Sequence, residues 1–327
     1  MVRKRILSGM RPTGNIHLGN LHGALMNWKE LQEEYDCFFF VADWHAMTSD
    51  YDATDHIKDH IRGMVIDWLS VGLSPERSTI FVQSHIKEHA ELFLILSMIT
   101  PLAWLERNPT YKEQIAQLKN KDLSTFGFLG YPVLQAADII MYKAHGVPVG
   151  VDQAPHVELT REIARRFNHF YGPIFPIPQT ILTPTPRLLG IDGRKMSKSY
   201  NNAIYISETP DQIRAKVSQM VTDTKRARRS DPGEPNDCNV YSFHNLYTDK
   251  EAISRIEQEC RKAEIGCVDC KELLAENLTR YLAPIYDKQN YYKNHPNLVT
   301  EIILEGCEKA RSVAQHTMEE VRAAIKI

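Results

Sequence analysis

The feature that most constrains the fold is an unbroken apolar run, Cys37-Phe38-Phe39-Phe40-Val41-Ala42. A run of this kind suits a β-strand that is covered on both faces, as the strands of parallel sheets are. Apolar residues at helical spacing follow over residues 55–73, and a second apolar strand is expected at residues 78–83. The alternation of strand and helix predicts an α/β chain with a doubly wound parallel sheet, in which ligands bind at the carboxyl ends of the strands.

The same rhythm extends over the first 200 residues. We expect strands at residues 5–9 and 147–149, and helices at 18–35, 88–100, 134–141 and 153–167. Residues 173–186 hold five prolines and are expected to form an irregular connection. Long helical patterns dominate after residue 202, at 209–220, 250–262, 271–282 and 297–324. The chain is therefore expected to have a nucleotide-binding domain over residues 1–200 and a mainly helical domain over 201–327, whose last helix packs on the first domain.

Composition limits the class of protein. The chain has 327 residues, 43% of them hydrophobic, and a formal net charge of −2, so a generally basic nucleic-acid binder is excluded and no DNA partner is expected. One local basic run, Lys225-Arg226-Ala227-Arg228-Arg229, could contact RNA or could equally be a solvated helix end. No apolar stretch is long enough for a membrane span, and the amino-terminal residues lack the features of a signal peptide. We expect a cytoplasmic protein with no membrane partner.

Two lysines three positions apart lie in the run Lys195-Met196-Ser197-Lys198-Ser199, which we call the KMSKS loop. Gly193 precedes them and favours a mobile loop. Two ammonium groups on such a loop can neutralise the charge that shifts onto pyrophosphate as it leaves. A solvated basic loop is the alternative interpretation, and a second phosphate-compatible segment near the start of the chain weighs against it.

That segment is His17-Leu18-Gly19-Asn20, the HLGN segment, which follows a short strand and a turn at residues 10–15. Free backbone N–H groups and the helix dipole make such a strand–turn–helix junction suitable for anions. The spacing narrowly misses a P-loop, because Asn20-Leu21 stands where Lys and Ser or Thr are required. The HLGN segment and the KMSKS loop together resemble the HIGH and KMSKS motifs of class I aminoacyl-tRNA synthetases.

Asp138 lies in an apolar helical stretch, where an ionised carboxylate needs a partner. It could accept from a substrate N–H or O–H, or it could cap another group or face solvent. Tyr131, Gln135 and Asp138 are at helical spacing and share one face. Downstream, a strand ends at Gly150-Val151-Asp152-Gln153, where the acid suits a ribose hydroxyl or a plain helix N-cap.

With His156-x-Glu158-Leu159-Thr160-Arg161 added, these stretches closely resemble bacterial tryptophanyl-tRNA synthetases over essentially the whole chain. The resemblance implies a Rossmann-like catalytic domain of the HUP class, a helical tRNA anticodon-recognition domain, and a homodimer. It implies that Asp138 accepts the indole N–H of L-tryptophan in a pocket lined by Leu7, His45, Tyr131, Gln135, Val147, Val149 and Gln153. His45 could equally be a satisfied core histidine. The residues implied to bind ATP are Arg11, Pro12, Thr13, His17, Gly19, Asn20, Lys112, Gly150, Val151, Asp152, Leu188, Lys195, Met196, Ser197, Lys198 and Ser199.

Four of the six cysteines have the spacing C-x21-C-x6-C-x2-C, at Cys238, Cys260, Cys267 and Cys270. Such a set suits a tetrahedral metal or an iron–sulfur cluster, and spacing alone does not choose between iron and zinc. Buried free thiols are the third possibility. A subset of tryptophanyl-tRNA synthetases holds a 4Fe-4S cluster through C-x22-C-x6-C-x2-C, and this chain resembles that subset with one residue fewer in the first interval.

The activity implied is tryptophan–tRNA ligation in two steps, through tryptophanyl-adenylate and then transfer to tRNA(Trp). Lys195, Lys198 and Asn20 are the expected catalytic residues, with Mg²⁺ as additional charge. A tyrosine-specific synthetase differs in the amino-acid pocket. An adenylyltransferase or a pantothenate-synthetase-like enzyme has a similar nucleotide fold and no need of RNA. A non-enzymatic iron–sulfur RNA-binding protein is the alternative from another class.

Overall fold

A computed structural model describes residues 3–109, 111–112, 122–182 and 188–327. The chain divides into two compact units. Unit 1 comprises residues 1–14, 26–184 and 292–327, and unit 2 comprises residues 15–25 and 185–291. No helix within the described residues combines the length and apolar composition needed to cross a bilayer.

A parallel five-stranded sheet forms the centre of the described part of unit 1, in the order β3-β2-β1-β4-β5. The strands are β1 (Arg5–Met10), β2 (Asp36–Val41), β3 (Ser78–Val82), β4 (Gly146–Val149) and β5 (Gln179–Leu182). β1 pairs with β2 from Arg5↔Asp36 to Met10↔Val41. β1 and β4 are neighbours in space but not in sequence, so the strand order reverses between them. In doubly wound folds the ligand crevice lies at this reversal, outside the carboxyl ends of the strands.

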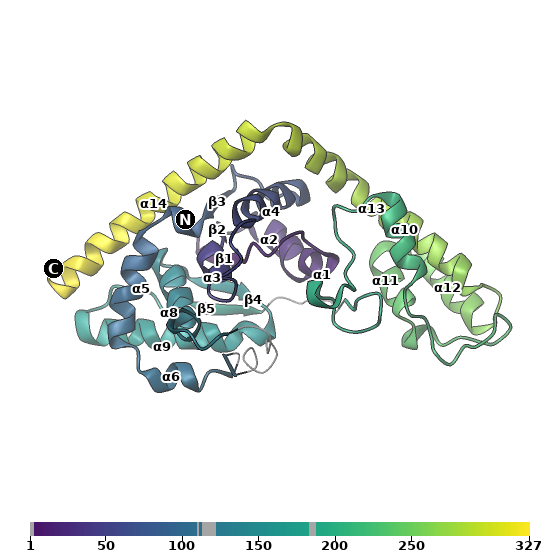
Figure 1. Ribbon diagram of the computed structural model, residues 1–327, viewed down its shortest axis with the longest axis horizontal. Helices are drawn as coiled ribbons and strands as arrows, with labels where there is room; N and C mark the ends of the chain where they lie inside the picture. Colours follow the sequence, from purple (N-terminus) through teal and green to yellow (C-terminus); the bar gives the residue numbers. More distant parts are fainter. Residues whose placement is uncertain (1–2, 110, 113–121, 183–187) are drawn as a thin grey trace. The chain divides into compact units, whose positions relative to one another are not determined.

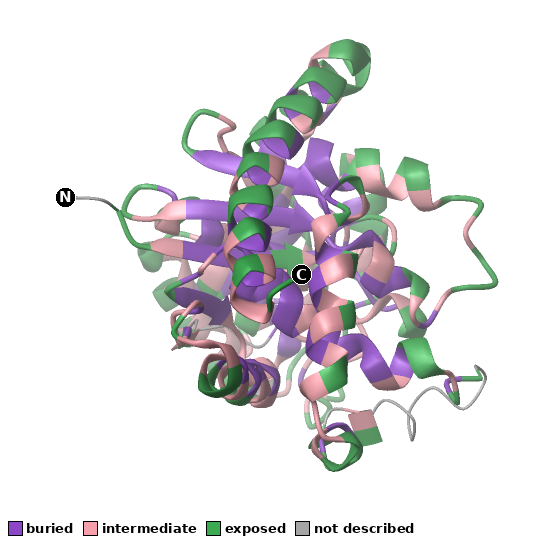
Figure 2. Ribbon diagram, turned by 90° about the vertical axis from the view of Figure 1, so that its left-hand side faces the viewer, coloured by how far each residue is buried: buried purple, intermediate pink, exposed green. Residues whose placement is uncertain are grey.

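Helices cover the sheet of unit 1, and Figure 2 shows the strands mostly buried beneath them. α4 ends at Gly72, which adopts the left-handed conformation (φ +114°) that glycine tolerates at a helix end. The helices described are α2 (Met26–Leu31), α3 (Asp43–Met47), α4 (Ile57–Val71), α5 (Glu88–Ile99), α6 (Leu102–Glu106), α8 (Phe126–Met141), α9 (Ala154–Tyr171) and α14 (Pro296–Ile325), with short 3-10 turns at Gln83–His85 and Val151–Gln153.

The last helix, α14, runs beside the edge strand β3 (Figure 1). Its buried residues recur every three or four positions, including Val299, Ile302 and Gly306. A Cβ atom placed on Gly306 would lie 1.8 Å from the carbonyl oxygen of Ile80, so the helix backbone approaches the strand backbone as closely as glycine permits. α14 therefore covers a sheet edge that would otherwise expose unpaired backbone groups.

Unit 2 is mainly helical and includes the HLGN segment. Its helices are α1 (Leu18–Asn20), the π-helical turn η1 (Leu21–Leu25), α10 (Pro210–Ser218), α11 (Asn239–Tyr247), α12 (Lys250–Arg261) and α13 (Cys267–Asn294, within this unit as far as Tyr291), with 3-10 turns at Lys198–Tyr200 and Pro235–Asp237. The segment around Ile16 joins this unit through a backbone hydrogen bond from Ile206 N to Ile16 O of 3.0 Å.

The predicted α/β sheet and helical second part are confirmed, with three differences. The compact units do not follow the single expected boundary at residue 200, because residues 15–25 fold with unit 2 and α14 folds with unit 1, as its expected packing requires. The helix expected at 18–35 is interrupted by the π turn η1. The connection expected to be irregular contains β5, while residues 183–187 lie outside the described part of the chain.

Candidate active site

The carboxyl ends of β1 and β4 bring together several predicted site residues of unit 1. Leu7 of β1 and Val147 of β4 are buried side by side in the sheet, and Val149 is half-buried. Ser8 ties the two strands together because its hydroxyl donates to the carbonyl of Pro148 at 3.3 Å. Apolar side chains at a strand reversal form a surface that suits an apolar ligand.

Asp138, on α8, is fully buried and accepts hydrogen bonds from three side chains. His45 Nε2 donates to Oδ2 at 2.7 Å, His89 Nδ1 donates to Oδ1 at 2.6 Å, and Gln83 Nε2 lies 2.8 and 3.0 Å from the two oxygens. Burial acts to raise the pKa of Asp138, but the hydrogen bonds from His45 and His89 outweigh it and lower the pKa to about 2. The carboxylate is ionised at neutral pH. Each of its two oxygens has two hydrogen-bond contacts, and one contact on each oxygen comes from the same Gln83 amide.

Two of these partners, Gln83 and His89, were not identified from the sequence. Gln83 follows β3 directly, and His89 is the second residue of α5. A polar residue just after a buried parallel strand is the signal that could have found Gln83. His89 Nε2 lies 2.7 Å from the hydroxyl of Tyr142, and burial keeps the pKa of Tyr142 well above its usual value. The tyrosine hydroxyl can therefore donate to Nε2 while Nδ1–H donates to Asp138.

Tyr131 lies on the same face of α8 as Asp138 and is also buried. Its hydroxyl lies 3.2 Å from His156 Nε2, and His156 Nδ1 lies 3.1 Å from Asn108 Nδ2. Burial raises the pKa of Tyr131, so the phenol is neutral, although the charge of Arg11 acts in the opposite direction. Gln135, predicted on this face, is half-buried.

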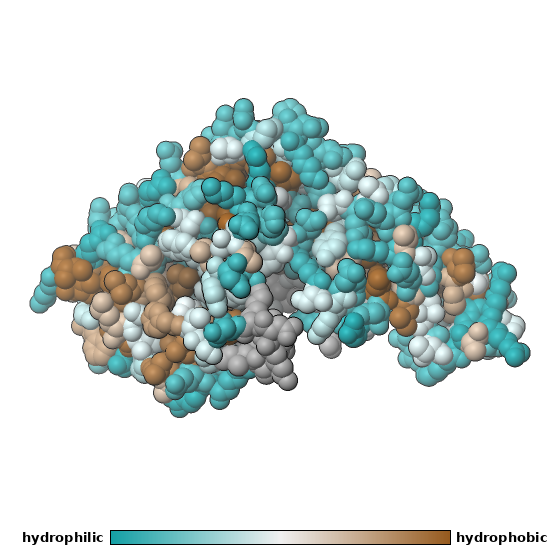
Figure 3. Space-filling view, in the orientation of Figure 1, coloured by the Kyte–Doolittle hydropathy of each residue, from teal (hydrophilic) through white to brown (hydrophobic). Residues whose placement is uncertain are grey.

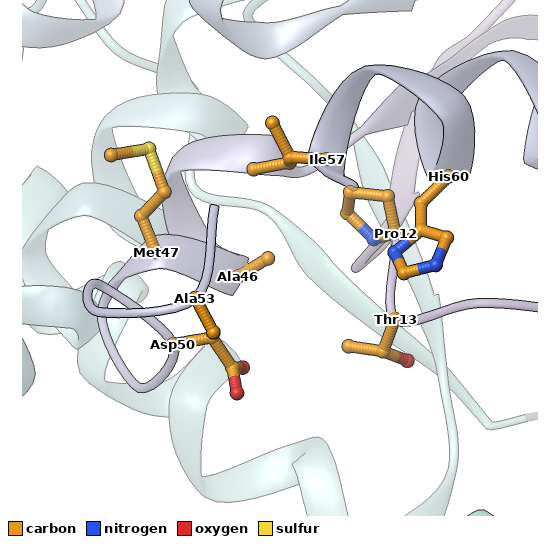
Figure 4. Close-up of a pocket in the computed structure, with 8 residues that line it drawn as sticks. All are labelled: Pro12, Thr13, Ala46, Met47, Asp50, Ala53, Ile57 and His60. Carbon is orange, nitrogen blue, oxygen red and sulfur yellow. The ribbon is translucent and has the colours of Figure 1, made fainter. Parts of the chain in front are cut away.

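A pocket beside the end of β1 is shown in Figure 4 and is lined by Pro12, Thr13, Ala46, Met47, Asp50, Ala53, Ile57 and His60. Pro12 and Thr13 were predicted from the sequence, whereas the other lining residues come from α3, α4 and the loop between them. Arg11 does not project as an isolated cation, because its Nη2 contacts Ser49 and lies 3.3 Å from Asp50 Oδ2. Asp50 thus joins the predicted Arg11 to the wall of this pocket.

The HLGN segment and the KMSKS loop lie side by side in unit 2. The backbone N–H of Gly19 approaches Met196 Sδ at 3.4 Å, and Leu18 N donates to Ile204 O at 2.9 Å. Burial and the charge of Lys198 lower the pKa of His17 to about 4. His17 and Asn20 form a reciprocal capping box in which Asn20 Oδ1 accepts from His17 N, so the Asn20 Nδ2 amide is the group able to donate to a ligand.

The KMSKS loop is organised by Asn202, a buried residue that sequence reasoning missed. Asn202 Nδ2 donates to Asp192 Oδ1 at 2.7 Å and to Lys195 O at 3.1 Å, and its Oδ1 accepts from Ser197 N at 2.8 Å. Met196 is buried and anchors the loop, while Lys195 is exposed. The loop is therefore held by its backbone, which leaves the Lys195 ammonium at the surface of unit 2.

The remaining predicted ATP residues occupy varied positions. In unit 1, Gly150 caps the turn Val151–Gln153, where Val151 is 74% exposed; the backbone of Asp152 belongs to this turn and its side chain lies outside the described part. Gln153 caps α9 and is half-buried, and Lys112 is exposed. Leu188, in unit 2, is buried, while Ser199 is exposed.

The four predicted cysteines gather in unit 2. Cys238 precedes α11, Cys260 lies near the end of α12, and Cys267 and Cys270 lie in the first turn of α13. Burial raises the pKa of Cys270 to about 12, and the charges of Cys238, Cys260 and Cys267 act in the same direction. Arg226 Nη1 lies 3.8 Å from Cys260 Sγ and from Cys267 Sγ, and His244 Nε2 lies 3.4 Å from Cys270 Sγ.

Two thiols beside a guanidinium have the donor chemistry of a thiolate-ligated group, since the cation offsets negative charge on sulfur. Within the described ranges, however, no three His, Cys, Asp or Glu side chains are arranged to hold a single metal ion. The basic run that contains Arg226 is largely engaged within the unit, because Lys225 pairs with Asp237 and Arg229 pairs with Asp269.

Comparison with known proteins places this geometry in a family. Residues 2–283 match the family of class I tRNA synthetases for W and Y. The chain is 54% identical to the tryptophan–tRNA ligase of Thermotoga maritima, over 99% of both chains, and 44% identical to that of Aquifex aeolicus, over 99% of this chain and 100% of the relative. The structure of tryptophanyl-tRNA synthetase from Campylobacter jejuni, complexed with ADP and tryptophan, superposes with a TM-score of 0.91 at 34% identity, over 99% of this chain and 100% of that chain.

The chain belongs to the class I tRNA synthetases. Within them it belongs to the tryptophan–tRNA ligases, since its full length aligns with these relatives. The Rossmann-like sheet and the enzyme class predicted from the sequence are thereby confirmed.

Proposed function

We propose that this chain activates L-tryptophan with ATP and then transfers it to tRNA(Trp), with Asp138 as the residue that recognises the amino acid. The observation that carries this assignment is a fully buried, ionised carboxylate on α8 to which Gln83 makes one shared contact with both oxygens. The indole N–H is a donor on an apolar ring, and we propose that it takes one of the two acceptor positions that Gln83 shares. An analogue without that donor makes no such hydrogen bond, so the site favours tryptophan.

The rest of the tryptophan site is proposed in unit 1. Leu7, Val147 and Val149 provide apolar contact for the indole. His45 holds the Asp138 carboxylate from one side and Tyr131 closes the same face of α8. Gln135 and Gln153 are half-buried amides that we propose contact polar atoms of the amino acid.

Two sets of residues are proposed to bind ATP. In unit 1 these are Arg11, Pro12 and Thr13 at the end of β1, Gly150, Val151 and Asp152 toward the ribose, and Lys112. In unit 2 these are His17, Gly19, Asn20, Leu188 beside adenine, and Lys195 to Ser199 toward the phosphates. Lys195, Lys198 and Asn20 are the proposed catalytic residues, with Mg²⁺ as additional charge on the phosphates.

In the first step, a carboxylate oxygen of tryptophan forms a bond to the α-phosphorus of ATP, and the bond to pyrophosphate breaks. The carboxylate is ionised at neutral pH, so the step requires no general base. The lysine ammoniums and the Asn20 amide stabilise the charge that moves onto pyrophosphate. In the second step a terminal ribose hydroxyl of the tRNA takes the acyl group and AMP leaves.

The test is tryptophan-dependent ATP–pyrophosphate exchange, with tyrosine as the competing amino acid. Lys195→Ala removes a charge that acts in the transition state, so we expect kcat to fall by about 10² or more while tryptophan binding, measured by calorimetry, is unchanged. Lys216→Ala, which removes a lysine paired with Glu208 in the same unit, is the control. Equal exchange with tyrosine, or a Lys195→Ala variant with normal exchange, contradicts the assignment.

We further propose a 4Fe-4S cluster on Cys238, Cys260, Cys267 and Cys270, with zinc as the alternative. The gathered thiols and the Arg226 guanidinium between two of them support a negatively charged thiolate set. Bound there, the cluster supplies a crosslink among the elements that carry the cysteines. Iron, zinc and sulfide analysis with a visible spectrum of anaerobically purified protein decides between the metals, and Cys270→Ser should lose the spectrum.

A homodimer is proposed on the exposed face of α5. This helix buries His89, Leu92 and Leu96 on one side, yet it also carries exposed Leu94 and Met98. Figure 3 shows apolar atoms gathered over α5 and its neighbours. A helix that is apolar on both sides is typical of a buried position, and a large exposed apolar patch indicates an interface. We also propose the cytoplasm, where translation occurs, as the location.

A further inference from the structure

Three aromatic side chains of unit 2 meet where the turn η1, which continues from the HLGN segment, contacts α11 and α13. His22 of η1 places Nε2 2.8 Å from the hydroxyl of Tyr247, the last residue of α11. The His22 ring also stacks on Tyr281 of α13, with ring centroids 6.1 Å apart and planes inclined by 25°. Tyr247 and Tyr281 meet edge-on at 5.0 Å. Each ring therefore contacts both of the others.

Burial makes this contact one between neutral groups. Burial lowers the pKa of His22 and raises the pKa of Tyr247 well above its ordinary value. A neutral imidazole and a neutral phenol can share a hydrogen bond throughout the neutral pH range. Tyr247 is 9% exposed, so loss of its partner would leave a polar atom with little access to water.

The backbone at His22 is unusual. Leu21–Leu25 forms a π-helical turn, which is wider than an α-helical turn and is frequent at functional sites. Leu21 and Leu25 are fully buried, whereas His22 makes the aromatic contact. The direction of the helix that begins at Leu18 is therefore set by its apolar side and by the contact of His22.

The beginning of the same segment is held by other groups. Leu18 N donates to Ile204 O, Ile206 N donates to Ile16 O, and Gly19 N approaches Met196 Sδ. These bonds attach the HLGN segment to the KMSKS loop and the chain that follows it. His22, two residues beyond Asn20, provides a second and separate attachment, to α11 and α13.

We propose that Tyr247 and Tyr281 are positioning residues for adenylation: through His22 they fix the helix that presents Gly19 and Asn20 to ATP. Neither tyrosine touches a substrate in this proposal, and their effect reaches ATP only through the HLGN segment. The inference rests on the ATP-binding role proposed above for that segment.

The experiment measures ATP–pyrophosphate exchange by the full chain for His22→Phe, Tyr247→Phe and the double variant. Each single substitution keeps an aromatic ring and removes one partner of the hydrogen bond. We expect the KM for ATP to rise about five-fold in each single variant, as for loss of one hydrogen bond, with the KM for tryptophan unchanged. Because both substitutions remove the same hydrogen bond, the KM for ATP of the double variant should be no higher than that of either single variant.

Tyr241→Phe is the matched control, because Tyr241 lies on α11 and its hydroxyl contacts Glu257 instead. It should leave both KM values unchanged. The proposal is overturned if both single variants keep the wild-type KM for ATP, if the KM for tryptophan rises equally, or if the two effects add in full. Lys195→Ala separates the failure of the two hypotheses. Normal pyrophosphate exchange by Lys195→Ala contradicts the proposed ATP site. Impaired exchange by Lys195→Ala, together with a wild-type KM for ATP in His22→Phe and Tyr247→Phe, contradicts only the positioning role.

Discussion

At the scale of single residues, Asp138 shows what a sequence can predict about a buried charge. The apolar sequence around Asp138 predicts that the carboxylate needs hydrogen-bonding partners, but it does not identify those partners. The partners His45, Gln83 and His89 are 93, 55 and 49 residues away and reach Asp138 only because β2 and β3 end beside α8. The need for a partner is a local property, whereas the partner's identity depends on the fold.

Asp138→Asn tests the recognition role. The amide keeps the shape of the side chain, but its NH₂ group faces the N–H donors of the histidines and Gln83, and the negative charge is lost. We expect kcat/KM for tryptophan to fall about 10- to 100-fold in pyrophosphate exchange, as for a hydrogen bond to a charged group. Asp36→Asn, which weakens an ion pair with Arg5 in the same unit, is the control. An unchanged kcat/KM for tryptophan would contradict the role.

Lys198 and His17 offer a test of the contact between the KMSKS loop and the HLGN segment. Lys198→Met removes the positive charge that helps to lower the pKa of His17. NMR titration of the His17 ring should show a midpoint near 4 in the parent chain and a higher midpoint in the variant, still below 6.5 because burial is the larger cause. Lys195→Met serves as the comparison, since Lys195 does not contribute to the shift. Equal midpoints in the parent and in Lys198→Met would show that Lys198 is not close to His17.

The same shift has a consequence for stability. The pKa of His17 in the folded chain is below that in the unfolded chain, so the unfolded state takes up the proton first as the pH falls. The contribution of neutral His17 is fully present above about pH 6.5 and is lost as the pH falls through about 4. In Lys198→Met this loss should be smaller, because the two pKa values lie closer together.

At the scale of elements, the contact of α14 with β3 depends on one glycine. Gly306→Ala would place a methyl group 1.8 Å from the carbonyl oxygen of Ile80, and neither backbone can yield without separating helix from strand. We expect the free energy of unfolding to fall by about 2–4 kcal/mol in urea denaturation. Gly63→Ala in α4 is the matched control, because nothing lies within 4 Å of its added Cβ atom. That variant should be unchanged or more stable by up to about 1 kcal/mol; equal effects of the two substitutions would exclude the close contact.

The elements that the sequence pattern missed share a physical reason. β5 has only four residues between prolines, so neither its length nor its composition stands out. α11 lies between the first two of the four clustered cysteine positions, and it has only nine residues, with buried Asn239 and His244 among them. α12 and α14 were predicted close to their observed bounds because many residues contribute to one apolar face, whereas only residues 271–282 of α13 were predicted.

At the scale of the whole molecule, the sequence predicts the sheet and the neighbouring motifs but not the partition of the chain. The HLGN segment follows β1 after a turn, so the pattern of strands and helices assigns it to the sheet domain. The backbone bonds of Leu18 with Ile204 and of Ile16 with Ile206, which join positions about 190 residues apart, assign it to unit 2. Long-range pairing of this kind leaves no periodic signal in the sequence.

The assembly is tested by charging the exposed face of α5. Leu94→Glu combined with Met98→Glu places two carboxylates on a patch proposed to be buried between two copies. Sedimentation equilibrium should show a dimer for the parent chain and a monomer for the double variant. Leu304→Glu, on an exposed position of α14, should remain dimeric. A monomeric parent chain at tens of micromolar concentration would contradict the proposed dimer.

The interleaving of the two units also has a consequence for biosynthesis. When the ribosome has produced the whole sheet, the edge of β3 still lacks α14, and residues 15–25 still lack the later segment to which they bind. Neither unit can complete its contacts until almost the entire polypeptide has been translated. A nascent chain of this enzyme should therefore remain vulnerable to proteases, and dependent on chaperones, until the ribosome reaches the final stretch of the message.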